Sequence, residues 1–302
     1  MLKPVRVLVT GAGGQAGAAL CRLLVEDPCF EAIPLMRAEL DITQAAGIAE
    51  ALSEHAPDYV VNCAGVTHFN QSGQQPDIFY AVNCEAVEHL AKACVAQKIP
   101  LLHLSSDAVF DSQYASGYAE DDAVAPQGVY GESVWQGEQR LRACLEQHII
   151  LRVSWLFSAH GANFLTATVR AAREEDTLQE MTSHVGCPTS AHDVARVITA
   201  MIKQLSSGAQ AWGTYHYCGA EVISRYDFCK EILIAASEYE SLRVEKLVPL
   251  NTADASAQDE LPSSSVLLCK KLLNIFGIRQ RPWRQELKAE MRALYQLGTS
   301  DS

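Results

Sequence analysis

The segment VLVTGAGGQAGAAL, residues 7–20, constrains the fold more than any other part of the chain. A run of apolar residues leads into Gly11, Gly14 and Gly17, and a helix-like pattern begins directly after them. Glycines at this spacing permit a tight turn, let the backbone approach a pyrophosphate and allow the helix to pack on the strand. The free N–H groups at the start of such a helix bind phosphate. This strand–turn–helix context predicts a dinucleotide-binding loop rather than an ordinary turn.

Short apolar runs alternate with helix-like segments through the first half of the chain. The expected strands span residues 5–10, 31–36, 58–65, 100–106 and 148–155. The expected helices span residues 15–26, 43–55 with Thr43 as the N-cap, 76–97 with Pro76 near its start, and 131–147. Strands that are apolar throughout and alternate with helices are typical of a parallel sheet covered on both faces. The predicted fold class is therefore α/β, with a doubly wound parallel (Rossmann) sheet.

The pattern is less regular after residue 156. Helices are expected at 163–174, 191–206, 225–238 and 283–297, with short strands near 213–217 and 244–248. We expect residues 1–156 to form a nucleotide-binding core. Residues 157–302 should form mainly a smaller C-terminal α/β substrate lobe, with some segments returning to the core. Ligands bind in doubly wound sheets at the strand ends that such a lobe would cover.

Composition excludes several classes of function. The formal net charge of −12 argues against a protein that coats nucleic acid. No apolar run approaches the roughly 20 residues that a membrane span requires. The ten cysteines form no CxxC pair, so we interpret them as reduced thiols of a cytoplasmic protein and expect no metal site.

The end of the second strand bears on the choice of cofactor. An NAD enzyme would hold the ribose 2′-hydroxyl with an acidic residue directly after this strand, and Arg37 stands there instead. A guanidinium can pair with a 2′-phosphate. The sequence thus favours NADP(H) over NAD(H), with an ordinary surface arginine as the alternative interpretation.

Several further motifs resemble those of one enzyme family, in the family's order. The chain resembles extended short-chain dehydrogenases/reductases of the dTDP-4-dehydrorhamnose reductase (RmlD-like) family, and the likeness covers most of its length. The motifs are GAGGQAG, ELDIT, VVNCAGVT, FYAVN, LSSDAVFD, LRVSWLF, GANF, VGCPTSAHDVA and GTYHYCG. The resemblance implies hydride transfer from a nicotinamide cofactor to a nucleotide-linked 4-keto sugar.

Site residues follow from the same resemblance, position by position. Ser106 takes the place of the family's Ser/Thr, and Tyr130 takes the place of its proton donor. The implied cofactor-binding residues are Gly11, Gly14, Gln15, Ala16, Gly17, Arg37, Asp41, Ile42, Cys63, Ala64, Gly65, Asn83 and Ser105. The implied substrate-binding residues are Thr67, Asp107, Val109, Phe110 and Trp155. The implied partner is a small nucleotide-sugar or related molecule, with a homodimer or a protein partner also possible.

The chain departs from the family pattern at the catalytic lysine. That residue belongs four positions after the tyrosine, and Val134 stands there. Ala108 and Leu261 also differ, on the substrate side, from the family's tyrosine and arginine. Two functions therefore stay open: a reductase that works without the lysine, and a weakly active or inactive cofactor-binding regulatory or scaffold protein. If the first holds, Val134→Lys should raise activity.

Overall fold

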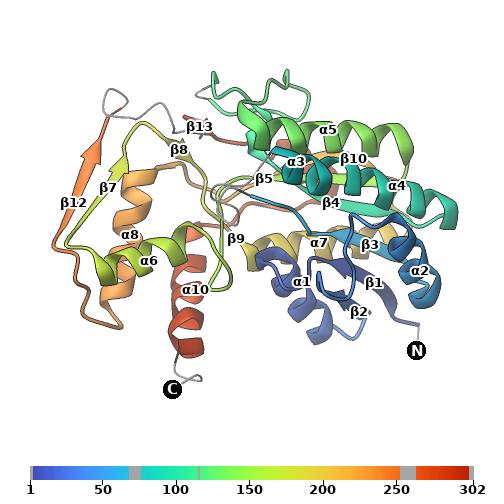
Figure 1. The fold of residues 1–302 in the computed structure, drawn as a ribbon, viewed down its shortest axis with the longest axis horizontal. Coiled ribbons are helices and arrows are strands. Elements are labelled where there is room, and N and C mark those ends of the chain that lie inside the picture. The colour runs from blue at the N-terminus through green and yellow to red at the C-terminus, as the bar shows by residue number, and fades with distance from the viewer. Residues whose placement is uncertain (1–2, 68–75, 115, 252–262, 299–302) are drawn as a thin grey trace.

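A six-stranded parallel sheet forms the centre of the larger lobe (Figure 1). The computed structural model describes residues 3–67, 76–114, 116–251 and 263–298. In sheet order the strands are β10 (Gly213–Tyr217), β5 (His148–Val153), β4 (Leu101–Ser106), β3 (Tyr59–Asn62), β1 (Val5–Thr10) and β2 (Phe30–Leu35). All five pairings are parallel. The chain winds outward from β1 in one direction and from β3 in the other, so the switch point lies between these two strands.

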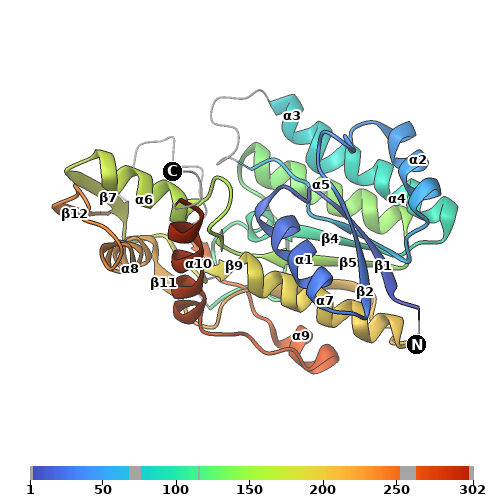
Figure 2. The same ribbon diagram turned by 90° about the horizontal axis from the view of Figure 1, so that it is seen from below.

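Helices cover both faces of the sheet, as Figure 2 shows. One face carries α1 (Gln15–Glu26) and α7 (Ala191–Ser206). The other carries α2 (Ala45–His55), α4 (Ala86–Gln97) and α5 (Gly128–Cys144). Alternation along β1 explains the two cores, because Val7 and Val9 face α1 and α7 while Leu8 faces α2 and α4.

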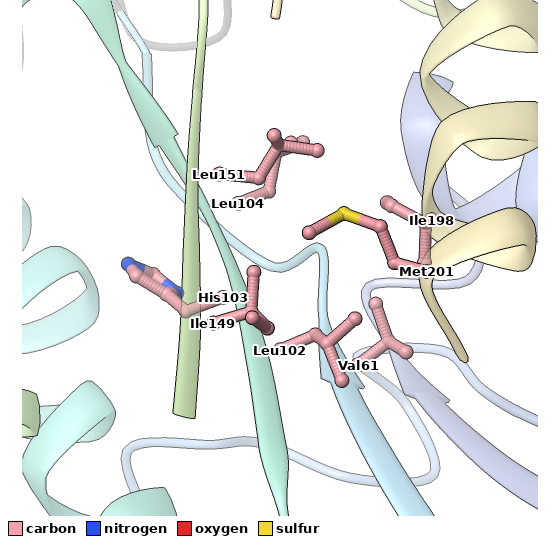
Figure 3. A pocket seen from close by; sticks show the side chains of 8 residues that line it. All are labelled: Val61, Leu102, His103, Leu104, Ile149, Leu151, Ile198 and Met201. Atoms are coloured by element: carbon pink, nitrogen blue, oxygen red, sulfur yellow. The ribbon is translucent and has the colours of Figure 1, made fainter. Parts of the chain in front are cut away.

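The core beneath α7 is densely packed. Figure 3 shows Leu104 and Leu151 of the sheet pointing toward Met201 of α7, while His103 points to the opposite face. The apolar side chains around this point leave no space for a water molecule. This region is therefore packed interior and not a ligand site.

The smaller lobe is built from the second half of the chain. Its helices are α6 (Phe164–Glu174), α8 (Arg225–Ser237) and α10 (Trp283–Gly298). Its short strands pair as β7 (Thr177–Met181) with β12 (Lys246–Leu250), and as β11 (Ile223–Ser224), β8 (Val185–Gly186) and β13 (Ser264–Ser265). β6 (Leu156–Phe157) pairs with β9 (Thr189–Ser190) between the lobes, and α9 (Lys270–Phe276) packs on β10. Buried Phe228 and Trp283 are central to the core of this lobe.

The predicted fold class is confirmed. From beyond residue 156, β10 completes the central sheet and α7 packs on one of its faces. The division of the chain at residue 156 stays a prediction. None of the helices in the described ranges is both long and apolar enough to cross a membrane.

Two predicted helix starts are wrong. Thr43 does not cap α2, because its amide and hydroxyl both donate to Asp41 Oδ1, at 3.0 and 2.8 Å, and the N-cap is Gln44. The helix expected from residue 131 begins at Gly128, so Tyr130 lies within its first turn. The predicted helix over residues 76–97 consists of α3 (Pro76–Tyr80), a π-helical turn (Ala81–Glu85) and α4.

Candidate active site

The glycine loop forms a close-packed cradle at the start of α1. Gly11 has φ +65°, and a Cβ there would lie 2.6 Å from the Ala64 amide nitrogen. A Cβ on Gly17 would lie 2.2 Å from the Gly11 carbonyl oxygen. The N-cap, Gly14, has no side chain to cap the helix, and the first turn carries no acidic residue. The first amides of α1 are thus available to an anion, which fits the pyrophosphate of a dinucleotide.

A second feature of this cradle also fits a ligand. Gln15 Oε1 is buried and accepts no hydrogen bond from any described residue. Its Nε2 donates to the Ala162 carbonyl at 3.5 Å, so the loop before α6 lies over the start of α1. A buried acceptor without a donor is costly, and a bound group with an N–H or O–H would satisfy it.

The residues after β2 lie where the adenine side of a dinucleotide would bind. Arg37 is exposed, and Ile42 is buried in the core. Asp41 accepts both hydrogen bonds from Thr43, and these bonds, with the nearby charge of Arg37, lower the pKa of its carboxyl. The Arg37 side chain is exposed, so its guanidinium is accessible to a 2′-phosphate.

The ends of β1, β3 and β4 are tied together by a buried polar network. Asn62 accepts a hydrogen bond from Thr10 Oγ1 at 2.6 Å and pairs through Nδ2 with His103 Nδ1 at 3.0 Å. Its Oδ1 also accepts the Ala64 amide at 3.1 Å. This network fixes the backbone of Cys63, Ala64 and Gly65, the predicted cofactor-side segment.

Asn83 positions this loop and α5 at once. It lies in the π-helical turn, a feature often found at functional sites. Its amide exchanges hydrogen bonds with both backbone groups of Val66, at 2.9 and 3.0 Å, and donates to Ser133 Oγ at 3.2 Å. Ser133 in turn donates to the Tyr130 carbonyl at 2.7 Å. The predicted cofactor contact of Asn83 is untested, and its side chain connects the β3 loop to the first turn of α5.

The structure brings Ser106 and Tyr130 together. Ser106 ends β4, and its hydroxyl hydrogen-bonds the side chain of Tyr130. Their approach depends on Gly131, because a Cβ there would lie 2.2 Å from the Ala108 carbonyl oxygen. The two residues predicted from the sequence to carry the chemistry therefore lie side by side at the carboxyl edge of the sheet.

The protonation state of Tyr130 follows from its surroundings. Burial raises the pKa of the phenol to about 12; the Ser106 hydroxyl opposes this shift, and the charge of Asp107 adds to it. No lysine or arginine among the described residues contributes to the shift. Tyr130 is thus a neutral phenol at physiological pH, which is the form required of a proton donor.

Val134 lies where a lysine would otherwise approach this tyrosine. It is 6% exposed and packs among apolar side chains and thiols, with Val109, Phe110, Tyr118 and Val266 among its cluster. The site is therefore closed by hydrocarbon at the position of the missing cation.

We expect Val134→Lys to lower the free energy of unfolding by about 1–3 kcal/mol, because a longer, charged side chain must enter a filled core. Urea unfolding measures this loss. Val25→Lys on α1 is the control, since Val25 is 75% exposed and its replacement should leave stability unchanged. Equal stability of the two variants would contradict the packing argument, whatever happens to activity.

The predicted substrate residues divide into two groups. Asp107 accepts a hydrogen bond from Ser106 at 2.9 Å. Trp155 is half-buried between the lobes and has φ +45°. Its indole packs against Gly186, where a Cβ would lie 2.4 Å from Trp155 Cε2. Thr67 is half-buried at the end of the described β3 loop. Val109 and Phe110 are instead fully buried, and Phe110 stacks on Tyr118 at 4.2 Å. These last two side chains belong to the core of the structure, and their contact with a substrate stays a prediction; Leu261 lies outside the described residues.

Sequence reasoning missed a buried ion-pair network beneath the site. Glu138 is fully buried, and its carboxylate accepts from Arg152 Nε and Nη2, at 2.9 and 2.7 Å, and from Arg142 at 2.7 Å. Ser105 donates to the same carboxylate at 2.5 Å, so its hydroxyl proton is engaged there, and its cofactor contact stays a prediction. Two signals were present in the sequence: Glu138 follows Tyr130 at the i+8 position of one helix, and Arg152 interrupts an apolar strand.

A hollow in the small lobe lies apart from this chemistry. It has a volume of about 530 Å³ and is lined by residues of α6, β7 and α8, and by none of the predicted site residues. All ten cysteines are free thiols. Within the described ranges, no group of three or more His, Cys, Asp or Glu side chains is arranged to hold a metal ion.

A doubly wound sheet, a glycine cradle at its switch point and a serine–tyrosine pair beside it define the class, a dinucleotide-binding oxidoreductase of the short-chain dehydrogenase/reductase type. The family model of the RmlD substrate binding domain matches residues 5–296. The chain belongs to this RmlD family of oxidoreductases.

Individual relatives agree with this assignment. The dTDP-4-dehydrorhamnose reductase of Aggregatibacter actinomycetemcomitans is 34% identical over 285 residues, covering 94% of this chain and 97% of the relative. The crystal structure of a dTDP-4-dehydrorhamnose reductase from Clostridium acetobutylicum superposes with a TM-score of 0.87 at 30% identity, covering 96% of this chain and 100% of that one. The Bacillus anthracis dTDP-4-dehydrorhamnose reductase, solved in complex with NADP, gives 0.85 at 28% identity with the same coverage.

Proposed function

We propose that this chain is an NADP(H)-dependent reductase of a nucleotide-linked 4-keto sugar or a related carbonyl compound. The observation that carries the proposal is the contact between Ser106 and a neutral Tyr130 at the carboxyl end of β4. The names of the relatives support the substrate class. Exposed Arg37 after β2 supports the preference for a 2′-phosphate.

The residues divide the work as follows. The dinucleotide supplies a hydride when bound. It would be held by the amides at the start of α1 and by the loop that Asn62 and Asn83 position. Ser106 Oγ would hydrogen-bond the carbonyl oxygen of the substrate. Tyr130 Oη would give its proton to that oxygen as it becomes an alkoxide, a far stronger base than phenolate.

A second candidate function is supported by one observation. Val134 fills the lysine position with buried hydrocarbon, so this position holds no cation to align a cofactor and stabilise phenolate. A protein that binds the dinucleotide and regulates or scaffolds a partner, without turnover, would also tolerate this replacement.

Cofactor titration followed by a substrate panel separates these candidates. NADPH and NADH binding is measured by fluorescence, and dTDP- and UDP-linked 4-keto sugars are then added to the NADPH complex. Loss of reduced-nicotinamide absorbance with one sugar would support the reductase. Tight binding without oxidation across the panel would favour the regulatory or scaffold role, and no binding of either dinucleotide would contradict both.

The glycine cradle allows a matched test of dinucleotide binding. Gly17→Ala should weaken NADPH binding by tenfold or more, about 1.4 kcal/mol, because its Cβ would lie 2.2 Å from the Gly11 carbonyl oxygen and force the loop open. Gly13→Ala is the control, since the nearest atoms to its Cβ are 3.7 Å away on the flexible Met36 side chain. Equal affinities for the two variants would show that the loop does not bind the dinucleotide.

A further inference from the structure

Asp107 lies in a ring of serine hydroxyls contributed by three separate segments. Ser106 from the end of β4 lies 2.9 Å from Asp107 Oδ1. Ser154, which follows β5, and Ser265 of β13 also hydrogen-bond the Asp107 carboxyl. Ser154 is itself held by the Ser265 carbonyl oxygen at 2.6 Å. The carboxyl is thus enclosed where the two lobes meet.

Asp107 and Tyr130 are joined through one hydroxyl. Ser106 Oγ contacts Asp107 on one side and the Tyr130 phenol on the other, and it accepts the Ala108 amide at 3.1 Å. A hydroxyl has one proton to donate and two lone pairs. With the Ala108 amide on one lone pair, Ser106 can accept from Tyr130 while donating to Asp107, or accept from Asp107 while donating to Tyr130. These two arrangements are the two ends of a proton relay.

We propose that Asp107 is the proton reservoir of this site, and that its carboxyl proton passes through Ser106 Oγ to Tyr130 Oη. The proposal rests on the proposed reductase function and assigns to Asp107 a role beyond substrate contact. It also gives the site a group that holds a proton for Tyr130, although Val134 fills the lysine position with hydrocarbon.

The electrostatic surroundings of Asp107 agree with this role. Burial raises the pKa of its carboxyl, and the contacts with the Ser265, Ser106 and Ser154 hydroxyls oppose that shift without outweighing it. The main causes of the pKa shift of Asp107 are burial and hydrogen bonds from hydroxyl and amide groups, and no cation is among them. The titratable groups that face Asp107 are Tyr130 from α5 and Cys187 from the small lobe, and its charge raises the pKa of both. Burial thus favours the protonated carboxyl at Asp107 more than at an exposed aspartate.

The relay balances atom by atom. The alkoxide oxygen of the product takes the Oη proton of Tyr130. The Ser106 hydroxyl then gives up its hydrogen bond to that oxygen and donates its proton to the phenolate. Ser106 then takes the carboxyl proton of Asp107, which is left as a carboxylate. No electrons move along this chain; Asp107 regains a proton from water after the product leaves.

The first test needs neither substrate nor cofactor. Carbon-13 NMR of the full-length protein labelled at aspartate carboxyl carbons follows each carboxyl with pH, and Asp107→Asn identifies the signal of Asp107. We expect the Asp107 signal to titrate at a higher pH than that of Asp111. The hydrogen bond from Tyr118 lowers the pKa of Asp111, and Asp111→Asn identifies its signal. An Asp107 signal that is fully ionised at and below neutral pH would overturn the proposal and leave the reductase function standing.

The second test uses turnover. Wild-type kcat should fall as pH rises through the Asp107 titration seen by NMR, whereas Asp107→Asn should lose this pH dependence and lower kcat by about tenfold or more. Ser106→Ala should interrupt the relay, and Ser106→Thr should restore it because the hydroxyl is kept. If kcat of Asp107→Asn still falls over the same pH range as in the wild type, the relay is contradicted. Absence of turnover with a protonated Asp107 would count against the reductase function alone.

Discussion

Tyr130→Phe should lower reductive turnover by about 10²–10⁴-fold, because it removes the hydroxyl that gives its proton to the alkoxide. The ring itself is retained, including its edge-on contact with Phe79 at 6.3 Å, so the fold and NADPH affinity should not change. Steady-state kinetics, NADPH titration and thermal unfolding measure the three quantities. Tyr114→Phe is the control, since it removes the same hydroxyl from a ring that is 48% exposed. Unchanged turnover in Tyr130→Phe would refute the assigned role.

The direction of the Tyr130 shift has a consequence for the reverse reaction. With a pKa of about 12, the phenol stays protonated throughout the neutral range, so its own titration should not limit reduction there. Oxidation of the alcohol needs the phenolate as a base, and this form becomes abundant only as pH approaches 12. The site should therefore favour reduction over oxidation at neutral pH more strongly than a site with a lysine beside the tyrosine.

The core architecture was predictable from the sequence because two local signals agree there. Apolar strands such as VRVLVT alternate with helices that carry one apolar face, and the glycine loop identifies the first crossover. The two-residue strands of the small lobe were not predicted, since Val185–Gly186 and Ser264–Ser265 are too short for a periodic pattern. Thr43 was assigned as a cap from residue type alone, and Asp41 competes for its donors.

The site was predictable only in part, for a similar reason. The spacing of Ser106 and Tyr130 in family-like motifs indicated that they belong together, and the structure places them in contact. Position in a motif does not tell which way a side chain points along a strand. Ser105 and Ser106 are neighbours, yet one contacts Glu138 and the other Tyr130. Phe110 likewise lies in a motif that the family resemblance assigns to substrate binding, but its side chain is buried in the core.

A buried ion pair joins α5, the helix that carries Tyr130, to the central sheet. Tyr130, Val134 and Glu138 occupy one face of α5, and Glu138 connects that face to Arg152 on β5. Burial raises the pKa of Glu138, but hydrogen bonds and charge from Arg152, with help from Arg142, outweigh it, so the net shift is downward. A carboxyl whose pKa is lower in the folded than in the unfolded state stabilises the fold fully at pH values above its unfolded-state pKa. This contribution is lost as pH falls through the folded-state pKa. The pair is therefore fully formed at neutral pH.

Glu138→Ala should lower the free energy of unfolding by about 3–5 kcal/mol at neutral pH, because it leaves Arg152, 1% exposed, as a buried charge without its partner. Urea unfolding measures the loss, and Glu132→Ala on the same helix is the control, because Glu132 is half-buried and only hydrogen-bonds Gln136. The double variant Glu138→Met, Arg152→Met should recover much of the loss, since it removes both charges and fills the space. If the double variant is as unstable as Glu138→Ala, the cost comes from the cavity and not from the unpaired guanidinium. If Glu138→Ala is no less stable than Glu132→Ala, the ion pair does not hold α5, and the position of Tyr130 must depend on Asn83 and Gly131 instead.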